Sequence, residues 1–161
     1  MQGKTRYLPV LTFLQHQLAG TLQEDEITHM LYPTAISRLL KIHLVAVGQG
    51  SATVEIAVDP ALHGNQQGTI HGGLMSELAD AAIGTAHSTL VNEGESFASI
   101  DLKINFMRPV WKSTLQACAK ATYQGKTVSH YHCDIFREDG KLVATAQSAV
   151  MTLRGDKAIG R

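Results

Sequence analysis

Two adjacent glycines stand at the start of a long apolar segment, directly after a histidine, in Thr69-Ile70-His71-Gly72-Gly73. The segment predicts a buried helix from about Gly72 to Leu90, with the glycines at its amino end. The first N–H groups of a helix have no partners inside the helix, and the helix dipole adds partial positive charge there. Glycine also lets a ligand carbonyl come within hydrogen-bonding distance of these donors. Gly72 and Gly73 therefore form a candidate oxyanion site.

A carboxylate, Asp80, lies one to two turns inside the same predicted helix. This position is too far from the helix start to be explained as a cap or by the helix dipole. Apolar residues cover most of the helix circumference, which predicts a mostly buried carboxylate. Such a group can act as a general base or a nucleophile, although a buried ion pair and a solvent-facing position stay open for a lone helical aspartate. Glu77, one turn earlier, also fits the ordinary preference for acids near a helix start.

The polar stripe of this helix and the loop before it complete the candidate site. The stripe contains Gly73, Ser76, Glu77, Asp80, Gly84 and His87. Glycines inside a helix cost about 1 kcal/mol each relative to alanine, so we expect something to approach the backbone closely. Asn65 lies in the preceding polar loop and offers an amide that is able to orient water. An oxyanion site, a carboxylate and such an amide are the parts that acyl transfer to water requires.

The elements that position these residues follow from the periodicity of the chain. Short helices are predicted near the amino end, at residues 6–19 and 23–32. Alternating apolar residues predict strands at 38–47, 52–58, 97–107, 114–123, 128–137 and 142–153. The sequence Glu138-Asp139-Gly140-Lys141 predicts a hairpin between the last two strands. This order indicates an α+β fold with an antiparallel sheet packed on one main helix.

The motif Asn65-x5-His71-Gly72-Gly73-x6-Asp80-x3-Gly84, followed by Ser99-x-Asp101, resembles the hotdog-fold acyl-CoA thioesterases of the phenylacetate-pathway (PaaI) type. The resemblance covers roughly residues 38–153. It implies a hotdog fold, in which an antiparallel sheet wraps around one long central helix. It also divides the chain into an N-terminal helical extension (1–37), a hotdog thioesterase domain (38–155) and a C-terminal tail (156–161).

The resemblance assigns catalytic roles by position. The N–H of Gly73 or Gly72 would polarise the thioester carbonyl, and Asp80 of the other subunit would act as base or nucleophile. Asn65 and Ser99 match positions that hold the carbonyl or the attacking water.

Two further residues are placed by the same motif. His71 is expected to orient the helix start rather than act as a base. Some relatives use a glutamate on this helix as the catalytic acid, so Glu77 is the alternative to Asp80 and is in any case expected beside the substrate.

The resemblance further implies a homo-oligomer, either a dimer with sheets joined edge to edge or a tetramer, with acyl-CoA bound at the subunit interface and no cofactor. Because CoA carries several phosphates, its site should be partly basic. Candidate residues near strand ends are Lys103, Arg108, Lys126 and Arg137, of which Arg108 is the best placed because Pro109 ends its strand.

Composition narrows the class of partner. The 161 residues are 44% hydrophobic, and 14 basic residues balance 14 acidic ones, which argues against nucleic acid or an anionic membrane as partner. Cys118 and Cys133 are too few for a disulfide framework, and no apolar segment approaches the ~20 residues that span a bilayer. His130-x-His132 lacks a third ligand at recognisable spacing, so no metal is expected. We expect a soluble, cytoplasmic protein.

Three other functions stay open at this point. The chain could be a non-catalytic hotdog module that binds acyl-CoA, an acyl-carrier-protein thioesterase, or a hydratase or dehydratase. An Asn65, Asp80 and Ser99 set beside the carbonyl argues for an enzyme rather than a simple binder.

Overall fold

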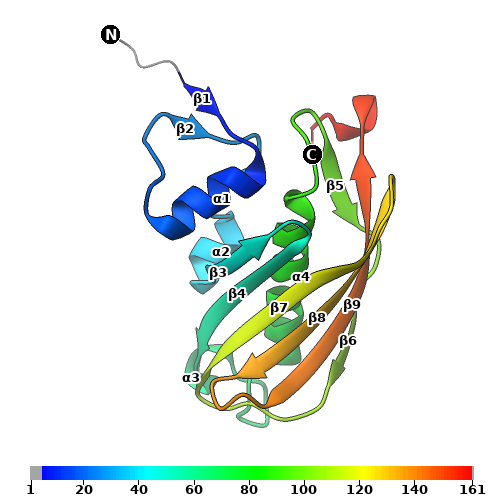
Figure 1. Ribbon diagram of the computed structural model, residues 1–161. Helices are drawn as coiled ribbons and strands as arrows, with labels where there is room; N and C mark the ends of the chain where they lie inside the picture. Colours follow the sequence, from blue (N-terminus) through cyan, green and yellow to red (C-terminus); the bar gives the residue numbers. More distant parts are fainter. Residues whose placement is uncertain (1–4, 161) are drawn as a thin grey trace.

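The computed structural model describes residues 5–160. Its main feature is a curled antiparallel sheet of seven strands wrapped around helix α4 (Gly72–Ser88) (Figure 1). The strand order is β3-β4-β7-β8-β9-β5, and β6 also pairs with β9. The strands are β3 (His43–Gly48), β4 (Ser51–Val58), β5 (Ser96–Ser99), β6 (Lys103–Phe106), β7 (Ser113–Gln124), β8 (Val128–Arg137) and β9 (Leu142–Leu153). This arrangement confirms the predicted α+β class, with the sheet around a single long helix.

The core lies between α4 and the concave face of the sheet. Successive strand residues point to opposite faces, so every second residue is buried against the helix along β4, along β7 as far as Ala119 and along β8 as far as Ile135. On the helix, Leu78, Ala79, Ala82, Ile83 and Ala86 have no exposed surface. The prediction that α4 is a buried helix is therefore confirmed.

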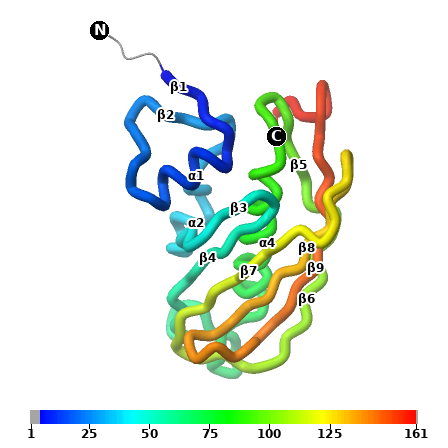
Figure 2. Tube along the Cα trace, in the orientation of Figure 1, coloured from blue at the N-terminus to red at the C-terminus, as the bar shows by residue number. Residues whose placement is uncertain are grey.

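The N-terminal extension lies at the β3 edge of the sheet, away from β5 (Figure 2). It contains β1 (Arg6–Tyr7), α1 (Val10–Ala19), β2 (Glu26–Ile27) and α2 (Ala35–Leu40). The helix predicted at 6–19 begins later than expected, because β1 pairs in parallel with β2 and Pro9 stands at the N-cap of α1. Proline fixes its own φ and is well tolerated where a helix begins.

The helix predicted at 23–32 is wrong. The acidic cluster that suggested a helix start instead supplies a buried ion partner: Glu26 pairs with Arg6, and its second carboxylate oxygen lies 3.0 Å from Nδ1 of His16. Glu26 is 4% exposed. A buried carboxylate needs such partners, and they come from β1 and α1, so tertiary contacts decide this segment.

Helix α2 occupies the place where a strand was predicted to begin at Arg38. Thr34 caps it, because Oγ1 of Thr34 accepts a hydrogen bond from the N–H of Ser37 at 3.2 Å. The chain leaves the helix through Lys41, whose φ is +58°. The strand β3 consequently begins at His43.

The strand predicted at 97–107 is divided into β5 and β6. Between them Asp101 binds the neighbouring strand by hydrogen bonds outside the ladder: its carboxylate accepts the N–H of Ala149 at 2.8 Å, and its carbonyl accepts the hydroxyl of Ser148 at 2.7 Å. A side chain that takes over a backbone partner interrupts the regular ladder.

The remaining differences are small. The predicted helix Gly72–Leu90 ends at Ser88, the polar loop at 61–69 begins with the end of a one-turn helix, α3 (Pro60–His63), and the tail contains the 3₁₀-helix η1 (Gly155–Ala158).

The last two strands, β8 and β9, have the predicted bounds, and Gly140 in their hairpin has a φ of +77°. The division of the chain at residue 37 stays a prediction, and α2 crosses it. In residues 5–160, none of the helices has the length and apolar character needed to cross a membrane.

Candidate active site

The start of α4 is capped by the histidine that precedes it. Nδ1 of His71 accepts the N–H of Gly73 at 2.9 Å, so this nitrogen carries no proton and the Gly73 donor is occupied. A Cβ on Gly72 would lie 2.8 Å from the ring of Phe106. The glycines predicted a close approach to the helix backbone, and side-chain rings of this chain make it: Phe106 at Gly72 and His71 at Gly73. Among residues 5–160, the N–H of Gly72 has no acceptor, so it is free to donate to a ligand.

Asn65 organises the loop that leads into this helix start. Its Oδ1 accepts the N–H groups of Gln67 and Thr69 at 2.9 and 3.2 Å, and its Nδ2 donates to Oγ1 of Thr69 at 3.0 Å. The loop then joins the sheet side of the molecule through the N–H of Ile70, which donates to the carbonyl of Val110. An amide nitrogen carries two N–H donors, so Nδ2 keeps one that the loop does not use.

The carboxylate Asp80 lies further along α4, beside the first strand after the helix. The hydroxyl of Ser99, on β5, donates to Oδ1 of Asp80 at 3.3 Å. Asp80 is half-buried rather than mostly buried as predicted, because its side of the helix faces a cavity. Glu77 is its neighbour one turn earlier. Burial raises the pKa of Glu77 above its usual value, and the negative charge of Asp80 raises it further.

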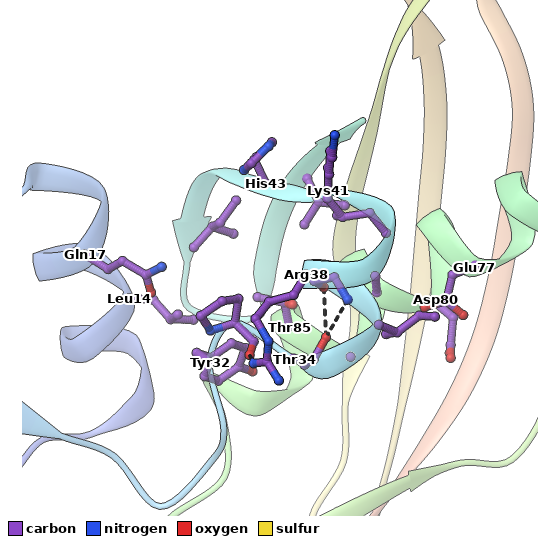
Figure 3. A pocket seen from close by; sticks show the side chains of 18 of the residues that line it. Leu14, Gln17, Tyr32, Thr34, Arg38, Lys41, His43, Glu77, Asp80 and Thr85 are labelled. Atoms are coloured by element: carbon purple, nitrogen blue, oxygen red, sulfur yellow. Dashed lines mark hydrogen bonds between the residues drawn. The ribbon is translucent and has the colours of Figure 1, made fainter. Parts of the chain in front are cut away.

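The cavity beside Asp80 has a volume of about 460 Å³. Glu77 and Asp80 lie on one side of it, and Leu14, Gln17 and Tyr32 lie on the other (Figure 3). Its apolar walls include residues of α1, α2, β4 and β5 as well as α4, among them Leu14, Ile36, Val54, Ala81 and Phe97. Polar side chains line it on both sides, among them Gln17 and Tyr32 as well as Glu77 and Asp80. A mostly apolar cavity with a few polar groups is a common form of ligand site.

His87 lies on the same polar stripe of α4 but does not belong to this site. It is 1% exposed and lies in the core. Its ring nitrogens are hydrogen-bonded to the hydroxyls of Tyr131 (2.9 Å) and Thr152 (3.0 Å). Burial lowers the pKa of His87 to about 4, so the ring is neutral near pH 7. The residue joins α4 to β8 and β9.

The four predicted phosphate contacts are scattered. Lys103 lies on β6 next to a hollow with His130 and His132, and Arg108 donates to the carbonyl of Leu142 at 2.5 Å. The guanidinium of Arg137 is held at 2.5 Å by Asp139.

None of these four basic residues lines the cavity beside Asp80, and Lys126 contributes its backbone carbonyl to Arg154. The basic residues that do line the cavity are Arg38, Lys41 and His43. None of the three is predicted for the site, because residues 38–47 are expected to form a plain strand. His132 is paired with Asp134 at 2.8 Å, and residues 5–160 contain no group of three side chains suited to a metal ion.

Comparison with known proteins identifies the family of this fold and site. Residues 67–144 match the model of the thioesterase superfamily. Human acyl-coenzyme A thioesterase 13 is 33% identical over 106 residues, which is 65% of this chain and 74% of the human protein. The chain belongs to the thioesterase superfamily. It is a thioester hydrolase, and the matched segment contains the helix start, Asp80 and Ser99.

Solved structures agree with this thioesterase in fold. The E. coli PaaI protein, from the phenylacetic acid degradation operon, is 28% identical and superposes with a TM-score of 0.69 over 78% of this chain and 88% of that one. The Pseudomonas aeruginosa protein PA5202 is also 28% identical, with a TM-score of 0.69 over 74% and 94% of the two chains. The resemblance to PaaI-type hotdog proteins is therefore confirmed.

Proposed function

We propose that this thioesterase hydrolyses acyl-CoA to the free acid and CoA, with Asp80 as the general base or nucleophile. The observation that carries the proposal is the Asp80–Ser99 pair, in which the carboxylate of Asp80 lines a mostly apolar cavity. Ser99 is able to orient the carboxylate or the attacking water, and the cavity offers space for an acyl group. The reaction needs a carboxylate, backbone donors and water, and no cofactor.

The spacing along α4 supports a reaction centre shared by two copies of the chain. Asp80 lies eight positions after Gly72, which at a rise of 1.5 Å per residue is roughly 12 Å along the helix. The free N–H and the carboxylate of one chain are therefore too far apart to act on one carbonyl. A partner subunit would bring its Asp80 to this chain's helix start.

The exposed edge of the sheet supports the same assembly. Strands β5 and β6 stand at the end of the strand order, and Ile100, Phe106 and Met107 near them are about half exposed (53%, 52% and 48%). An unpaired edge with apolar side chains favours pairing with another strand. We propose a homodimer joined along this edge.

The chemistry is as follows. Asp80 takes a proton from water as the water oxygen bonds to the carbonyl carbon, and the negative charge that forms on the carbonyl oxygen is held by the N–H of Gly72. The C–S bond then breaks, and the thiolate of CoA leaves and takes the proton. In the nucleophilic variant, an Asp80 oxygen attacks first, thiolate leaves, and water hydrolyses the anhydride.

The neighbouring residues take supporting roles in this proposal. The unused N–H of the Asn65 amide would donate to the same carbonyl or to the water. His71 acts through the cap, since its Nδ1 holds the Gly73 N–H and cannot accept another proton while it does so. For the CoA phosphates Arg108 is the better candidate, because the charge of Arg137 is already paired with Asp139.

Thiol release from acetyl-, decanoyl-, palmitoyl- and phenylacetyl-CoA, with wild type beside Asp80→Asn, tests the proposal. We expect kcat of Asp80→Asn to fall ~100-fold or more without unfolding, which corresponds to about 2.7 kcal/mol of barrier. The matched control is Asp134→Asn, which removes a carboxylate paired with His132 and should keep wild-type turnover.

Other outcomes have clear meanings. Full activity in Asp80→Asn with loss in Glu77→Gln would move the catalytic acid to Glu77. Binding of acyl-CoA without thiol release from any ester would contradict hydrolysis of CoA esters by this chain. Equal rates with pantetheine esters would show that the nucleotide of CoA is not recognised, as expected for an acyl-carrier-protein thioesterase.

A further inference from the structure

The cavity beside Asp80 is closed by a part of the chain that lies outside the matched thioesterase segment. It is lined by Leu14 of α1, by Tyr32 before α2 and by Ile36 of α2, together with residues of α4 and the sheet. Figure 3 shows α1 and Tyr32 on the side of the cavity opposite Glu77 and Asp80. The N-terminal extension therefore forms the far wall of the space that begins at the catalytic carboxylate.

This far wall is fixed to the central helix. The hydroxyl of Tyr32 donates to Oγ of Ser88 at 2.5 Å, and that hydroxyl in turn donates to the carbonyl of Thr85 at 2.6 Å. Burial raises the pKa of Tyr32, so its hydroxyl keeps the proton that the bond needs. The depth of the cavity is consequently set by packing and by a hydrogen bond rather than by a loose segment.

One position on α4 leaves space that a side chain would fill. Gly84 lines the cavity, and a Cβ built on it would only touch the ring of Phe97, at 3.8 Å. The backbone does not require glycine here, in contrast to the prediction of a close approach. The missing side chain adds volume to the cavity.

We propose that this cavity is the acyl pocket and that the N-terminal extension sets its depth, selecting aliphatic acyl groups of medium length. At the ~30 Å³ that one water molecule occupies, the cavity of about 460 Å³ has room for at most roughly fifteen packed carbons. A chain that leaves the open end of the cavity unfilled is shorter, roughly eight to twelve carbons. The inference rests on the proposed function, because it takes Asp80 as the point where the thioester lies.

The test compares two tryptophan substitutions on the same short helix. Ile36 lines the cavity, whereas Leu39 is 75% exposed and does not. With a series from acetyl- to palmitoyl-CoA, we expect wild type to prefer eight to twelve carbons. In Ile36→Trp we expect kcat/KM for decanoyl-CoA to fall at least ~10-fold while that for butyryl-CoA changes less than ~3-fold. Leu39→Trp should keep the wild-type profile.

A second substitution and a binding measurement make the result independent of folding and of turnover. Gly84→Leu fills the same cavity from the helix side and should give the same shift toward short chains. Calorimetry with decanoyl-CoA in the Asp80→Asn background should show at least ~10-fold weaker binding when Ile36→Trp is added.

The outcomes separate the two proposals. A profile unchanged in both Ile36→Trp and Gly84→Leu, or a wild-type preference for acetyl- or phenylacetyl-CoA, would overturn the assignment of the pocket while Asp80-dependent hydrolysis stands. Absence of turnover on every ester would overturn the proposed function, and chain-length-dependent binding would still decide the pocket.

Discussion

The polar stripe of α4 contains two sites that the fold treats in opposite ways. His87, in the last turn, is 1% exposed, and both of its ring nitrogens are hydrogen-bonded to side chains of the sheet. Asp80, two turns earlier, is half-buried, accepts a hydrogen bond from Ser99, and faces a cavity. The two residues occupy the same side of one helix.

The difference shows how a structural polar group is told from a functional one. The imidazole of His87 has two hydrogen-bonding positions and both are used, so it has no capacity for a ligand. A carboxylate accepts up to about four hydrogen bonds, so Asp80 keeps capacity on the side of the cavity. Unused hydrogen-bonding capacity beside an open space, rather than polarity, marks the site.

The strongest test of this comparison is His87→Ala. The substitution removes two hydrogen bonds and leaves the hydroxyls of Tyr131 and Thr152 buried beside a new cavity. We expect the free energy of unfolding to fall by about 3 kcal/mol, measured by urea denaturation. The folded variant should retain kcat within ~3-fold, because His87 does not face the cavity.

The two measurements on His87→Ala distinguish a structural role, which lowers the free energy of unfolding, from a catalytic role, which lowers kcat. Loss of turnover in a protein that keeps its unfolding midpoint would place His87 in the reaction and would contradict the comparison. The variant His87→Gln, which preserves some hydrogen bonding, should lie between wild type and His87→Ala in stability.

Ser99→Ala tests the contact that distinguishes Asp80. The loss of one hydroxyl donor to a carboxylate should lower kcat ~10-fold, about 1.4 kcal/mol, with KM nearly unchanged. The matched control is Ser96→Ala, three residues earlier on β5 and therefore on the opposite face of the strand. Equal effects of the two substitutions would show that the Ser99–Asp80 contact has no role in turnover.

Long strands and the main helix could be predicted from the sequence. The bounds of β8 and β9 were predicted correctly, because ten or more residues of alternating pattern give a strong signal. The N-terminal extension could not be predicted in the same way. The conformation around Glu26 depends on Arg6 and His16, which belong to other elements, and no local pattern encodes that pairing.

The spacing of the motif located the candidate site but did not show the surroundings of each polar residue on the helix. Motif spacing put the helix start and Asp80 on one helix, and the structure places Ser99 against Asp80. The motif selects Asp80, but its spacing could not show that His87 is a core residue, because the partners of His87, Tyr131 and Thr152, are 44 and 65 residues away in sequence. The wall formed by the N-terminal extension was missed for the same reason, since a cavity is a property of packed elements.

Glu77→Gln should have the smallest effect and refines the comparison within the site itself. Because burial and the charge of Asp80 raise the pKa of Glu77, the folded state holds this proton more tightly than the unfolded chain. Folding stability therefore decreases as the pH rises from about the ordinary value of 4.5 through the raised pKa. Removing the charge should make Glu77→Gln slightly more stable than wild type at pH 7, and the difference should vanish below about pH 4.

The activity of Glu77→Gln should stay within ~5-fold of wild type, because the proposed base is intact. Thermal unfolding between pH 4 and 8 and thiol release at pH 7 measure the two effects on one variant. A stability gain with near-normal turnover would show that the negative charge of Glu77 lowers the folding stability and is not needed for the reaction. A loss of turnover as large as that of Asp80→Asn would instead show that the two carboxylates act together in catalysis. The criterion of unused hydrogen-bonding capacity would then apply to the pair of carboxylates rather than to Asp80 alone.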